Sequence, residues 1–140
     1  MHYILKLRMQ LGKAMLSCLM LAIECEGKNI LTIEGMANQE TGQLHPIREA
    51  FVKYSGMQCG MCTPGMIVSA KALLDENPNP TEDDVREALA GNLCRCCNYK
   101  RITECVLAAA QTGKVITESL AEAAGKAVLS EATPPSKNTY

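Results

Sequence analysis

The residues most able to do chemistry are eight cysteines in a chain of 140 residues. Four of them form two close pairs, Cys59-Gly-Met-Cys62 and, after 31 further residues, Cys94-Arg-Cys96. Four thiolates that meet at one place are soft ligands, which select zinc or an iron–sulfur cluster. Structural zinc sites usually combine two C-x₂₋₄-C pairs, and the C-x-C pair fits that pattern poorly. On spacing alone, a [2Fe–2S] cluster that passes electrons and a structural zinc site with four cysteine ligands both stay open.

Disulfide bonding would be a third use of an even number of cysteines, if the protein were exported. The basic segment Met1–Lys13 precedes the apolar run Ala14–Ile23, an order also found in signal peptides. That run is too short to span a bilayer, and Glu24-Cys25-Glu26 follows it without a cleavage pattern of small residues. We therefore expect a cytoplasmic protein without membrane association, in which cysteines bind metal.

Composition supports a helical domain and argues against nucleic-acid binding. The chain is 47% apolar but only 4% aromatic, so its core must be built from aliphatic side chains, which suit packed helices. Its length suffices for one domain with short appendages. A net charge of −1, a pI near 6.1 and scattered basic residues provide no footprint for nucleic acid.

Four helices are predicted to position the cysteine pairs. Apolar residues recur at helical spacing in each helix. Three of the starts are marked by Pro46 as a first helical residue, by Thr63 as an N-cap before Pro64, and by the Thr81/Asp84 capping box. Tyr54 is expected on the inward face of the first helix. The predicted helices run from Pro46 up to Ser55-Gly56, from Thr63-Pro64 to about Leu74, from Thr81 up to Gly91-Asn92, and from about Asn98 to Gln111.

Each cysteine pair is thereby placed in a loop just before a helix. Helix N-termini carry partial positive charge and unpaired N–H donors, which stabilise thiolates and an anionic cluster. Gly60 and Gly91 are expected to let the backbone turn and approach the metal closely. Backbone N–H···S bonds of this kind also tune the potential of a cluster.

The ends of the chain are predicted to be less helical. Alternating residues indicate a strand over Leu5–Gln10, and a second is expected at Ile30–Ile33. Turns are predicted at Gly12-Lys13 and Glu26–Asn29, a linker at Asn38–Gln43, a further helix at Val115–Leu129 and a disordered tail at Ala132–Tyr140.

Several blocks together resemble the iron–sulfur subunit of molybdenum hydroxylases, the family of xanthine dehydrogenase, aldehyde oxidoreductase and aerobic carbon monoxide dehydrogenase. The similarity extends from about Lys13 to Ala108. The blocks that carry it are Gln58–Met66, Asn77–Pro80, Gly91–Cys96, Ser17–Ala22, Leu31–Gly35 and Leu44–Phe51.

The resemblance implies a mainly α fold: a four-helix [2Fe–2S]-binding domain after a short remnant of a β-grasp plant-type ferredoxin domain. The implied domains are residues 1–35 (ferredoxin-like remnant), 36–43 (linker), 44–112 (helical cluster-binding domain) and 113–140 (C-terminal extension). By the same resemblance, Cys59, Cys62, Cys94 and Cys96 are the cluster ligands, and Gln58 faces a pterin. The implied partners are a large subunit that binds molybdopterin and a medium subunit that binds FAD.

The chain departs from this family in its first part. A plant-type ferredoxin domain supplies a C-x₄-C-x₂-C group and a distant fourth cysteine, and here only the fourth, Cys18, is present. One thiolate cannot hold a cluster, so we expect a single cluster in this polypeptide. A truncated reading of a longer protein is the favoured explanation, over a degenerate gene product. The first 35 residues should then be poorly ordered or expose an unpaired edge.

A second departure follows the ligands, where the family usually has Cys-Arg-Cys-Thr-Gly-Tyr and this chain has Cys94-Arg-Cys-Cys-Asn-Tyr99. Asn98 can replace the glycine in a left-handed or capping position. Cys97 could compete with Cys96 as a ligand, but the C-x-C spacing favours Cys96. Cys25 and Cys105 are expected to be buried apolar residues.

The resulting hypothesis is a non-catalytic subunit that relays electrons from a molybdenum centre toward a flavin subunit. Neither His2 nor His45 lies in a constellation that suggests catalysis, and His45 is expected at the surface where a helix begins. Arg95 lies between two ligands and is interpreted either as a cation near the cluster or as a solvated surface residue. The alternatives are a structural module that binds zinc through the four cysteines and a non-functional truncated fragment.

Overall fold

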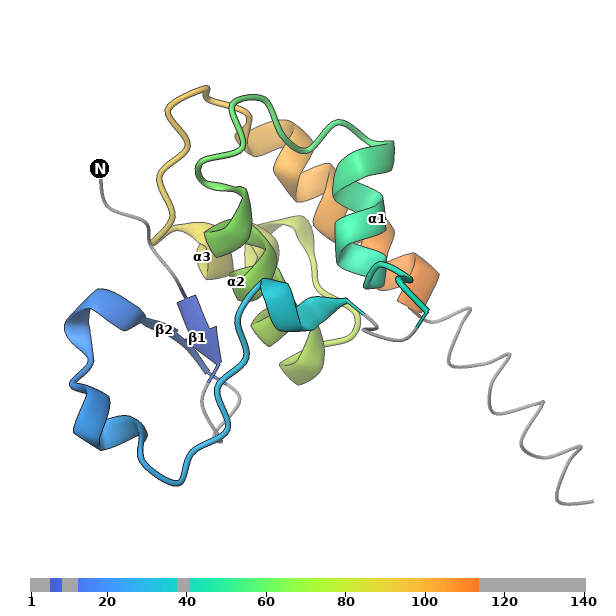
Figure 1. The fold of residues 1–140 in the computed structure, drawn as a ribbon. Helices are drawn as coiled ribbons and strands as arrows, with labels where there is room; N and C mark the ends of the chain where they lie inside the picture. Colours follow the sequence, from blue (N-terminus) through green and yellow to red (C-terminus); the bar gives the residue numbers. More distant parts are fainter. Residues whose placement is uncertain (1–5, 9–12, 38–40, 114–140) are drawn as a thin grey trace, which may run out of the picture.

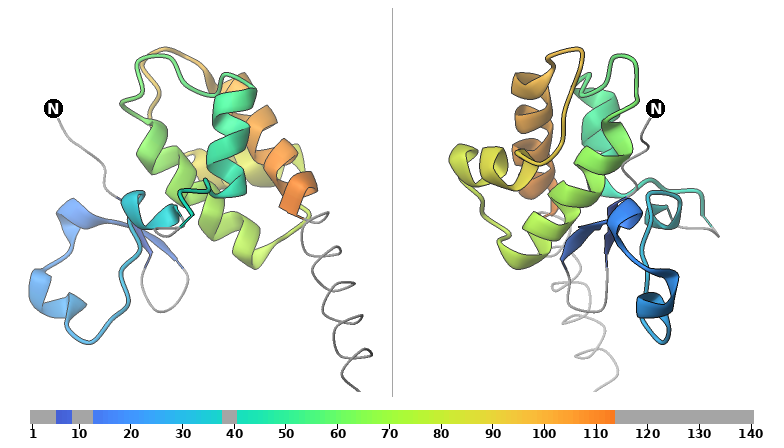
Figure 2. Two further views of the ribbon diagram at one scale, coloured as in Figure 1. Left: turned by 45° about the vertical axis from the view of Figure 1, so that its right-hand side comes forward. Right: turned by 90° about the vertical axis from the view of Figure 1, so that its left-hand side faces the viewer.

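The computed structural model describes residues 6–8, 13–37 and 41–113. This part of the chain is mainly helical, with α1 (Pro46–Lys53), α2 (Thr63–Glu76), α3 (Glu82–Leu89) and a fourth helix over residues 99–113. Figure 1 and Figure 2 show α2 near the middle of the molecule and α1 alongside the fourth helix. All four predicted helices are confirmed within a few residues at each end.

Local capping explains where two of the helices begin. Pro46 is the first residue of α1, and the Nδ1 atom of His45 accepts a hydrogen bond from the Ile47 N–H at 3.3 Å. At α3 the Thr81 hydroxyl accepts from the Asp84 N–H at 3.2 Å, and the Asp84 carboxylate accepts from the Thr81 N–H at 2.7 Å. The bond from the Thr81 backbone lowers the pKa of Asp84. The predicted capping box is therefore confirmed.

One aliphatic core joins the four helices. The prediction that Tyr54 faces inward is wrong, because α1 ends at Lys53 and the Tyr54 side chain is 40% exposed. The largest fully buried side chains come from all four helices, and they are Ile47, Phe51, Met66, Val85, Ile102, Cys105 and Val106.

The segment before the helices contains little regular structure. β1 (Lys6–Arg8) pairs antiparallel with β2 (Ala14–Leu16), and both strands contact α2. Within the described residues this sheet has two strands, so each has an edge without a strand partner. The strand expected at Ile30–Ile33 is wrong, since of these residues only residue 31 forms a bridge. The turn at Glu26–Asn29 is confirmed, with Gly27 at φ +70°.

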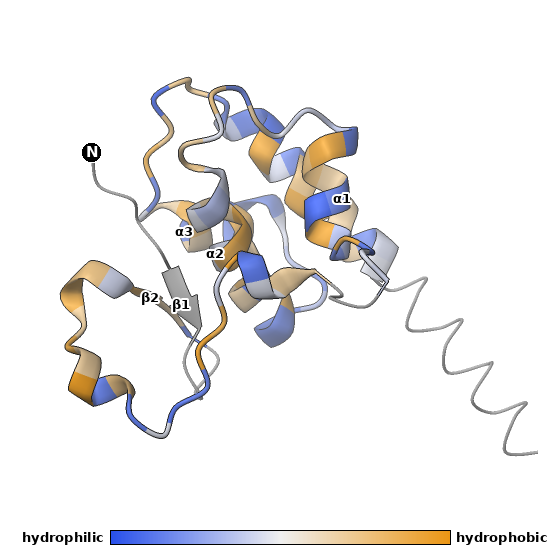
Figure 3. Ribbon diagram, in the orientation of Figure 1, coloured by the Kyte–Doolittle hydropathy of each residue, from blue (hydrophilic) through white to orange (hydrophobic). Residues whose placement is uncertain are grey.

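Large apolar side chains are exposed after β2. Leu19, Leu21 and Ile23 are 78%, 66% and 77% exposed, and Figure 3 shows this apolar stretch away from the helices. The helix predicted at 115–129, the tail at 132–140 and part of the linker at 38–43 lie outside the described residues. None of the helices in the described part of the chain has the length and apolar character needed to cross a membrane.

Candidate metal centre

The two cysteine pairs lie in two neighbouring connections at one end of the helical bundle. Cys59 and Cys62 lie between α1 and α2, and Cys94 and Cys96 lie between α3 and the fourth helix. Figure 1 and Figure 2 show these two connections side by side in every view. Cys62 is the N-cap residue of α2, and two residues separate Cys96 from the start of the fourth helix at residue 99. The predicted placement of both pairs at helix N-termini is confirmed.

The four thiols form two pairs, each with one thiol from each connection. The Cys96 thiol lies close enough to Cys59 to shift the pKa of Cys59, and the Cys94 thiol lies close enough to Cys62 to shift the pKa of Cys62. Within the residues that the structure describes, no three His, Cys, Asp or Glu side chains converge as the ligands of one metal ion. This arrangement offers two thiols to each of two metal atoms.

Local hydrogen bonds and burial give these thiols different proton affinities. A hydrogen bond from the Met61 backbone and contact with the Cys96 side chain lower the pKa of Cys59. Burial and contact with Cys94 raise the pKa of Cys62 to about 11. At Cys96 a hydrogen bond from the Cys59 backbone lowers the pKa. The Cys59 thiol and burial act in the opposite direction and outweigh it, so the pKa of Cys96 is raised. Cys59 is therefore poised to become a thiolate before Cys62 and Cys96, and metal binding would release protons from those two.

The centre is buried on one side and open on the other. The Cys94 side chain is 6% exposed, and its sulfur accepts a hydrogen bond from the Asn98 backbone N–H at 3.4 Å. Cys59 is exposed, whereas Cys62 and Cys96 are half-buried. The predicted N–H···S bonds are thus present, and they stabilise negative charge on sulfur.

A small cavity of about 130 Å³ lies between the two connections, next to the first cysteine pair. The amide of Asn92 borders it and donates from Nδ2 to the Ser69 hydroxyl at 3.0 Å, which ties the second connection to α2. Its lining residues are Cys59, Met61, Cys62, Gly65, Asn92, Leu93 and Arg95. Four soft donors, backbone N–H groups on sulfur and this adjoining space fit a thiolate-bound cluster.

The predictions for Gly60 and Gly91 have different outcomes. Gly60 has φ +81°, which only glycine adopts without strain, so its predicted role in the turn is confirmed. Gly91 also lies in a turn, but its φ is not positive and a Cβ atom added there would meet no described residue within 4 Å, so the turn does not require glycine; its close approach to the metal stays a prediction.

The residues next to the ligands also differ from expectation. Thr63 was predicted as the N-cap of α2, but Cys62 takes that position, and the buried Thr63 hydroxyl has no hydrogen-bond partner among the described residues. The left-handed residue of the second connection is Cys97, at φ +57°, and not Asn98. Asn98 precedes the fourth helix, as expected for a cap, and its side chain is 8% exposed.

The other candidate residues lie apart from the thiol pairs or on their rim. Cys18 is exposed, Cys105 is fully buried as predicted, and Cys25 is only half-buried, so the prediction of burial is wrong for Cys25. His45 caps α1 and is half-buried, where surface exposure was expected; burial lowers its pKa. Gln58 is exposed directly before Cys59, and His2 lies outside the described residues.

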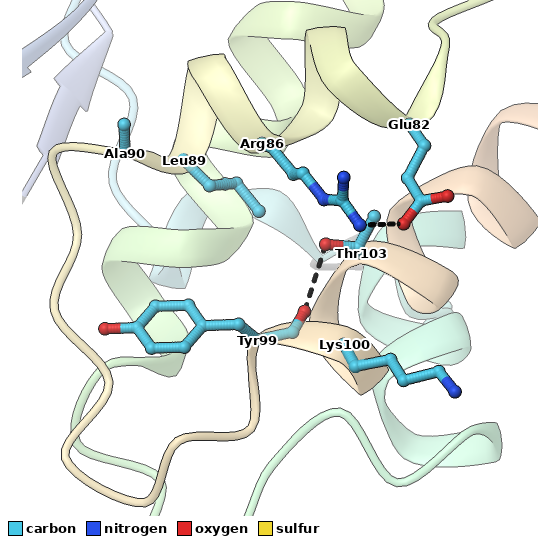
Figure 4. Close-up of a pocket in the computed structure, with 7 residues that line it drawn as sticks. All are labelled: Glu82, Arg86, Leu89, Ala90, Tyr99, Lys100 and Thr103. Atoms are coloured by element: carbon cyan, nitrogen blue, oxygen red, sulfur yellow. Dashed lines mark hydrogen bonds and ion pairs between the residues drawn. The ribbon is translucent and has the colours of Figure 1, made fainter.

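Tyr99 is a site residue that the sequence reasoning missed. Its hydroxyl accepts a hydrogen bond from the Cys94 backbone N–H at 2.7 Å, and the Thr103 hydroxyl donates to its carbonyl oxygen at 3.0 Å. Figure 4 shows the Tyr99 ring beside Leu89 and Ala90, at a groove of about 400 Å³ that lies between α3 and the fourth helix and contains no cysteine. An aromatic residue five positions after Cys94 was the only available signal.

Comparison with known proteins identifies the helical part of the chain. Residues 32–107 match the family model described as a [2Fe-2S] binding domain. The chain is 48% identical over 96 residues to the nicotine 6-hydroxylase small subunit of Paenarthrobacter nicotinovorans, which covers 69% of this chain and 56% of that subunit. It is 45% identical over 91 residues to the nicotinate dehydrogenase small FeS subunit of Eubacterium barkeri, covering 65% and 57%. The chain thus spans about half the length of these relatives.

Solved structures agree with this assignment. Quinoline 2-oxidoreductase from Pseudomonas putida 86 superposes with a TM-score of 0.71 at 39% identity, over 78% of this chain and 67% of that one. The aldehyde oxidoreductase from Desulfovibrio gigas superposes with a TM-score of 0.70 at 40% identity, over 78% of this chain and 12% of that one. The chain belongs to the family of [2Fe–2S] binding domains, in the form carried by the iron–sulfur subunits of molybdenum hydroxylases.

Proposed function

We propose that this chain carries electrons through one [2Fe–2S] cluster bound by Cys59, Cys62, Cys94 and Cys96. The observation that supports it most is the pairing of thiols from two helix N-termini across two connections. A binuclear cluster takes two thiolates at each iron, so Cys59 with Cys96 and Cys62 with Cys94 would each hold one iron atom. When bound, the cluster supplies one-electron oxidation and reduction.

The protein's own groups set the conditions for that chemistry. The N–H of Asn98 on the Cys94 sulfur and the backbone of Met61 near Cys59 stabilise negative charge, which favours the reduced form. Cys94 is buried, Cys62 and Cys96 are half-buried and Cys59 is exposed, so the Cys59 thiol is the most exposed of the four ligands. Exchange with a redox partner is therefore proposed to occur on the Cys59 side.

The proposed partners are a large subunit that binds molybdopterin and a medium subunit that binds FAD. In this assignment electrons arrive from the molybdenum centre and leave toward the flavin, and the chain itself transforms no substrate. Gln58 would face the pterin, a role that its exposed position next to Cys59 permits. Two relatives are named as small subunits, which supports a place in a larger assembly.

The domain organisation is part of the proposal. We assign residues 1–35 to a ferredoxin-like remnant that contains β1 and β2, residues 36–43 to a linker, 44–112 to the cluster domain and 113–140 to an extension. A cytoplasmic location, expected from the use of cysteine, stays a prediction.

The decisive experiment is anaerobic purification of the full chain, followed by metal analysis, visible absorption and electron paramagnetic resonance of the reduced protein. Two irons and two sulfides per chain with a single spin signal would support the proposal. A colourless protein with stoichiometric zinc would overturn it in favour of a structural module.

Ligand assignment is tested on the same material with a matched pair of variants. Cys94→Ser should abolish the visible absorption and the spin signal, whereas Cys25→Ser should leave both unchanged, because Cys25 lies apart from the thiol pairs. Co-expression with a molybdopterin subunit and a flavin subunit tests the partners. Failure to co-purify would favour a chain that no longer docks.

A further inference from the structure

We propose that the Asn98 side chain is a positioning residue that sets the spacing between the two ligand connections. The inference rests on the proposed function and concerns a side chain that itself contacts no metal. The Nδ2 atom of Asn98 donates to the carbonyl oxygen of Ser55 at 3.3 Å, and its backbone N–H donates to the Cys94 sulfur at 3.4 Å. One residue thus holds the start of the first connection while it contacts a ligand in the second.

The hydrogen bond from Asn98 to Ser55 can fix the position of the second connection because its acceptor, the Ser55 carbonyl, belongs to a rigid segment. Ser55 has φ +55°, and the next residue, Gly56, donates from its N–H to the Phe51 carbonyl at 2.8 Å. A Cβ atom added at Gly56 would lie 2.7 Å from the Cys105 sulfur and 2.8 Å from the Phe51 ring. The segment before Cys59 is therefore fixed against the core, and Asn98 ties the second connection to that fixed point.

The bond to Ser55 requires the amide group of the Asn98 side chain. Only the amide nitrogen of Asn98 can donate to a carbonyl oxygen, and the side chain is 8% exposed, so water competes little for this bond. Replacement of Asn98 by glycine would leave the Ser55 carbonyl without this donor.

The test compares Asn98→Ala with Thr103→Val in the full chain, after reconstitution with iron and sulfide. Thr103 is also buried on the fourth helix, and its hydroxyl makes a hydrogen bond within that helix, to the Tyr99 carbonyl at 3.0 Å. Both variants lose one buried hydrogen bond, so both should lower the melting temperature of the metal-free chain to a similar extent.

Only Asn98→Ala should act on the bound cluster. We expect it to release iron to a chelator about five- to tenfold faster than the wild type, and to broaden the spin signal because the ligand spacing becomes variable. Thr103→Val should change neither. Equal chelation rates and line widths in the two variants would overturn the proposal.

A third variant keeps the positioning role testable if Asn98→Ala does not fold. If Asn98→Ala is insoluble, Asn98→Gly decides, since glycine is tolerated at a helix N-cap. It should release iron as fast as predicted for alanine, and wild-type behaviour would reject the positioning role. If the wild type and Thr103→Val take up no [2Fe–2S] cluster, the proposed function fails. If both take it up and only the Asn98 effect is missing, the positioning role alone fails.

Discussion

The phenolic oxygen of Tyr99 lies 2.7 Å from the backbone nitrogen of Cys94 and accepts its hydrogen bond. A tyrosine at the start of the fourth helix therefore satisfies a backbone donor in the connection that carries the second cysteine pair. This bond and the Asn98 N–H on the Cys94 sulfur fix the same residue from two sides. Cys94 is consequently held in place before any metal is bound.

Tyr99→Phe should destabilise the metal-free chain by about 1–3 kcal/mol, because it leaves the Cys94 N–H without its acceptor. Urea unfolding followed by circular dichroism measures the change. Tyr54→Phe is the matched control, since the Tyr54 side chain is 40% exposed and that of Tyr99 is 42% exposed. Equal losses in the two variants would show that the bond contributes nothing to stability.

Cys96→Ser should lose the cluster, and Cys97→Ser should retain it. The Cys96 side chain contacts Cys59, whereas Cys97 is exposed and its sulfur lies 3.9 Å from the Arg95 carbonyl oxygen. Iron content and visible absorption after reconstitution measure the difference. Retention in Cys96→Ser, with loss only when Cys97 is also replaced, would assign the fourth ligand to Cys97.

Gly56→Ala should destabilise the fold by about 1–3 kcal/mol through overpacking, because the new Cβ would lie 2.7 Å from the Cys105 sulfur. Thermal unfolding of the metal-free chain provides the measurement. Gly91→Ala is the control, since a Cβ there meets nothing within 4 Å. The double variant Gly56→Ala/Cys105→Ala should recover part of the loss. A Gly56→Ala protein as stable as Gly91→Ala would contradict the packing described at this position.

The stability of the metal-free, reduced chain should fall as pH rises from about 9 toward 11. Burial, helped by the Glu104 charge, raises the pKa of Cys105 from its ordinary 9.0 to about 11. Above pH 9 the unfolded chain releases this proton while the folded chain keeps it, so the contribution is present below pH 9 and is lost on the way to 11. Cys105→Ala should reduce the slope of the curve in this window and leave the part contributed by Cys62, as measured by urea unfolding at several pH values. Parallel curves for the two proteins would rule out Cys105 as a source of the dependence.

Local signals in the sequence predicted the elements that carry the site. The Thr81/Asp84 capping box and the proline at position 46 depend on neighbouring residues only, and the structure contains both as predicted. The placement of both cysteine pairs before helices followed from the same local signals. That placement allowed the two loops to enclose one metal centre, and the structure brings both helix N-termini to the same end of the bundle.

The errors concern choices that depend on contacts between distant residues. Either Cys62 or Thr63 could be the N-cap residue of α2. Thr63 is buried within the helix, and Cys62 takes the N-cap position. Asn98 was expected in a left-handed or a capping position; it takes the capping position, and the left-handed residue is Cys97, which was not expected. The Tyr99 bond to Cys94 also depends on the folded path of the chain, which no local pattern contains.

The proximity of Cys59 and Cys96 has a consequence for the stability of a copy that has lost its metal. Along the sequence, α2 and α3 lie between these two thiols, so a centre that joins them closes a ring that includes two of the four helices in the described residues. Closing such a ring removes conformations from the unfolded chain, and the binding free energy then counts as folding free energy. A copy that loses its iron would unfold more often and become a substrate for proteases.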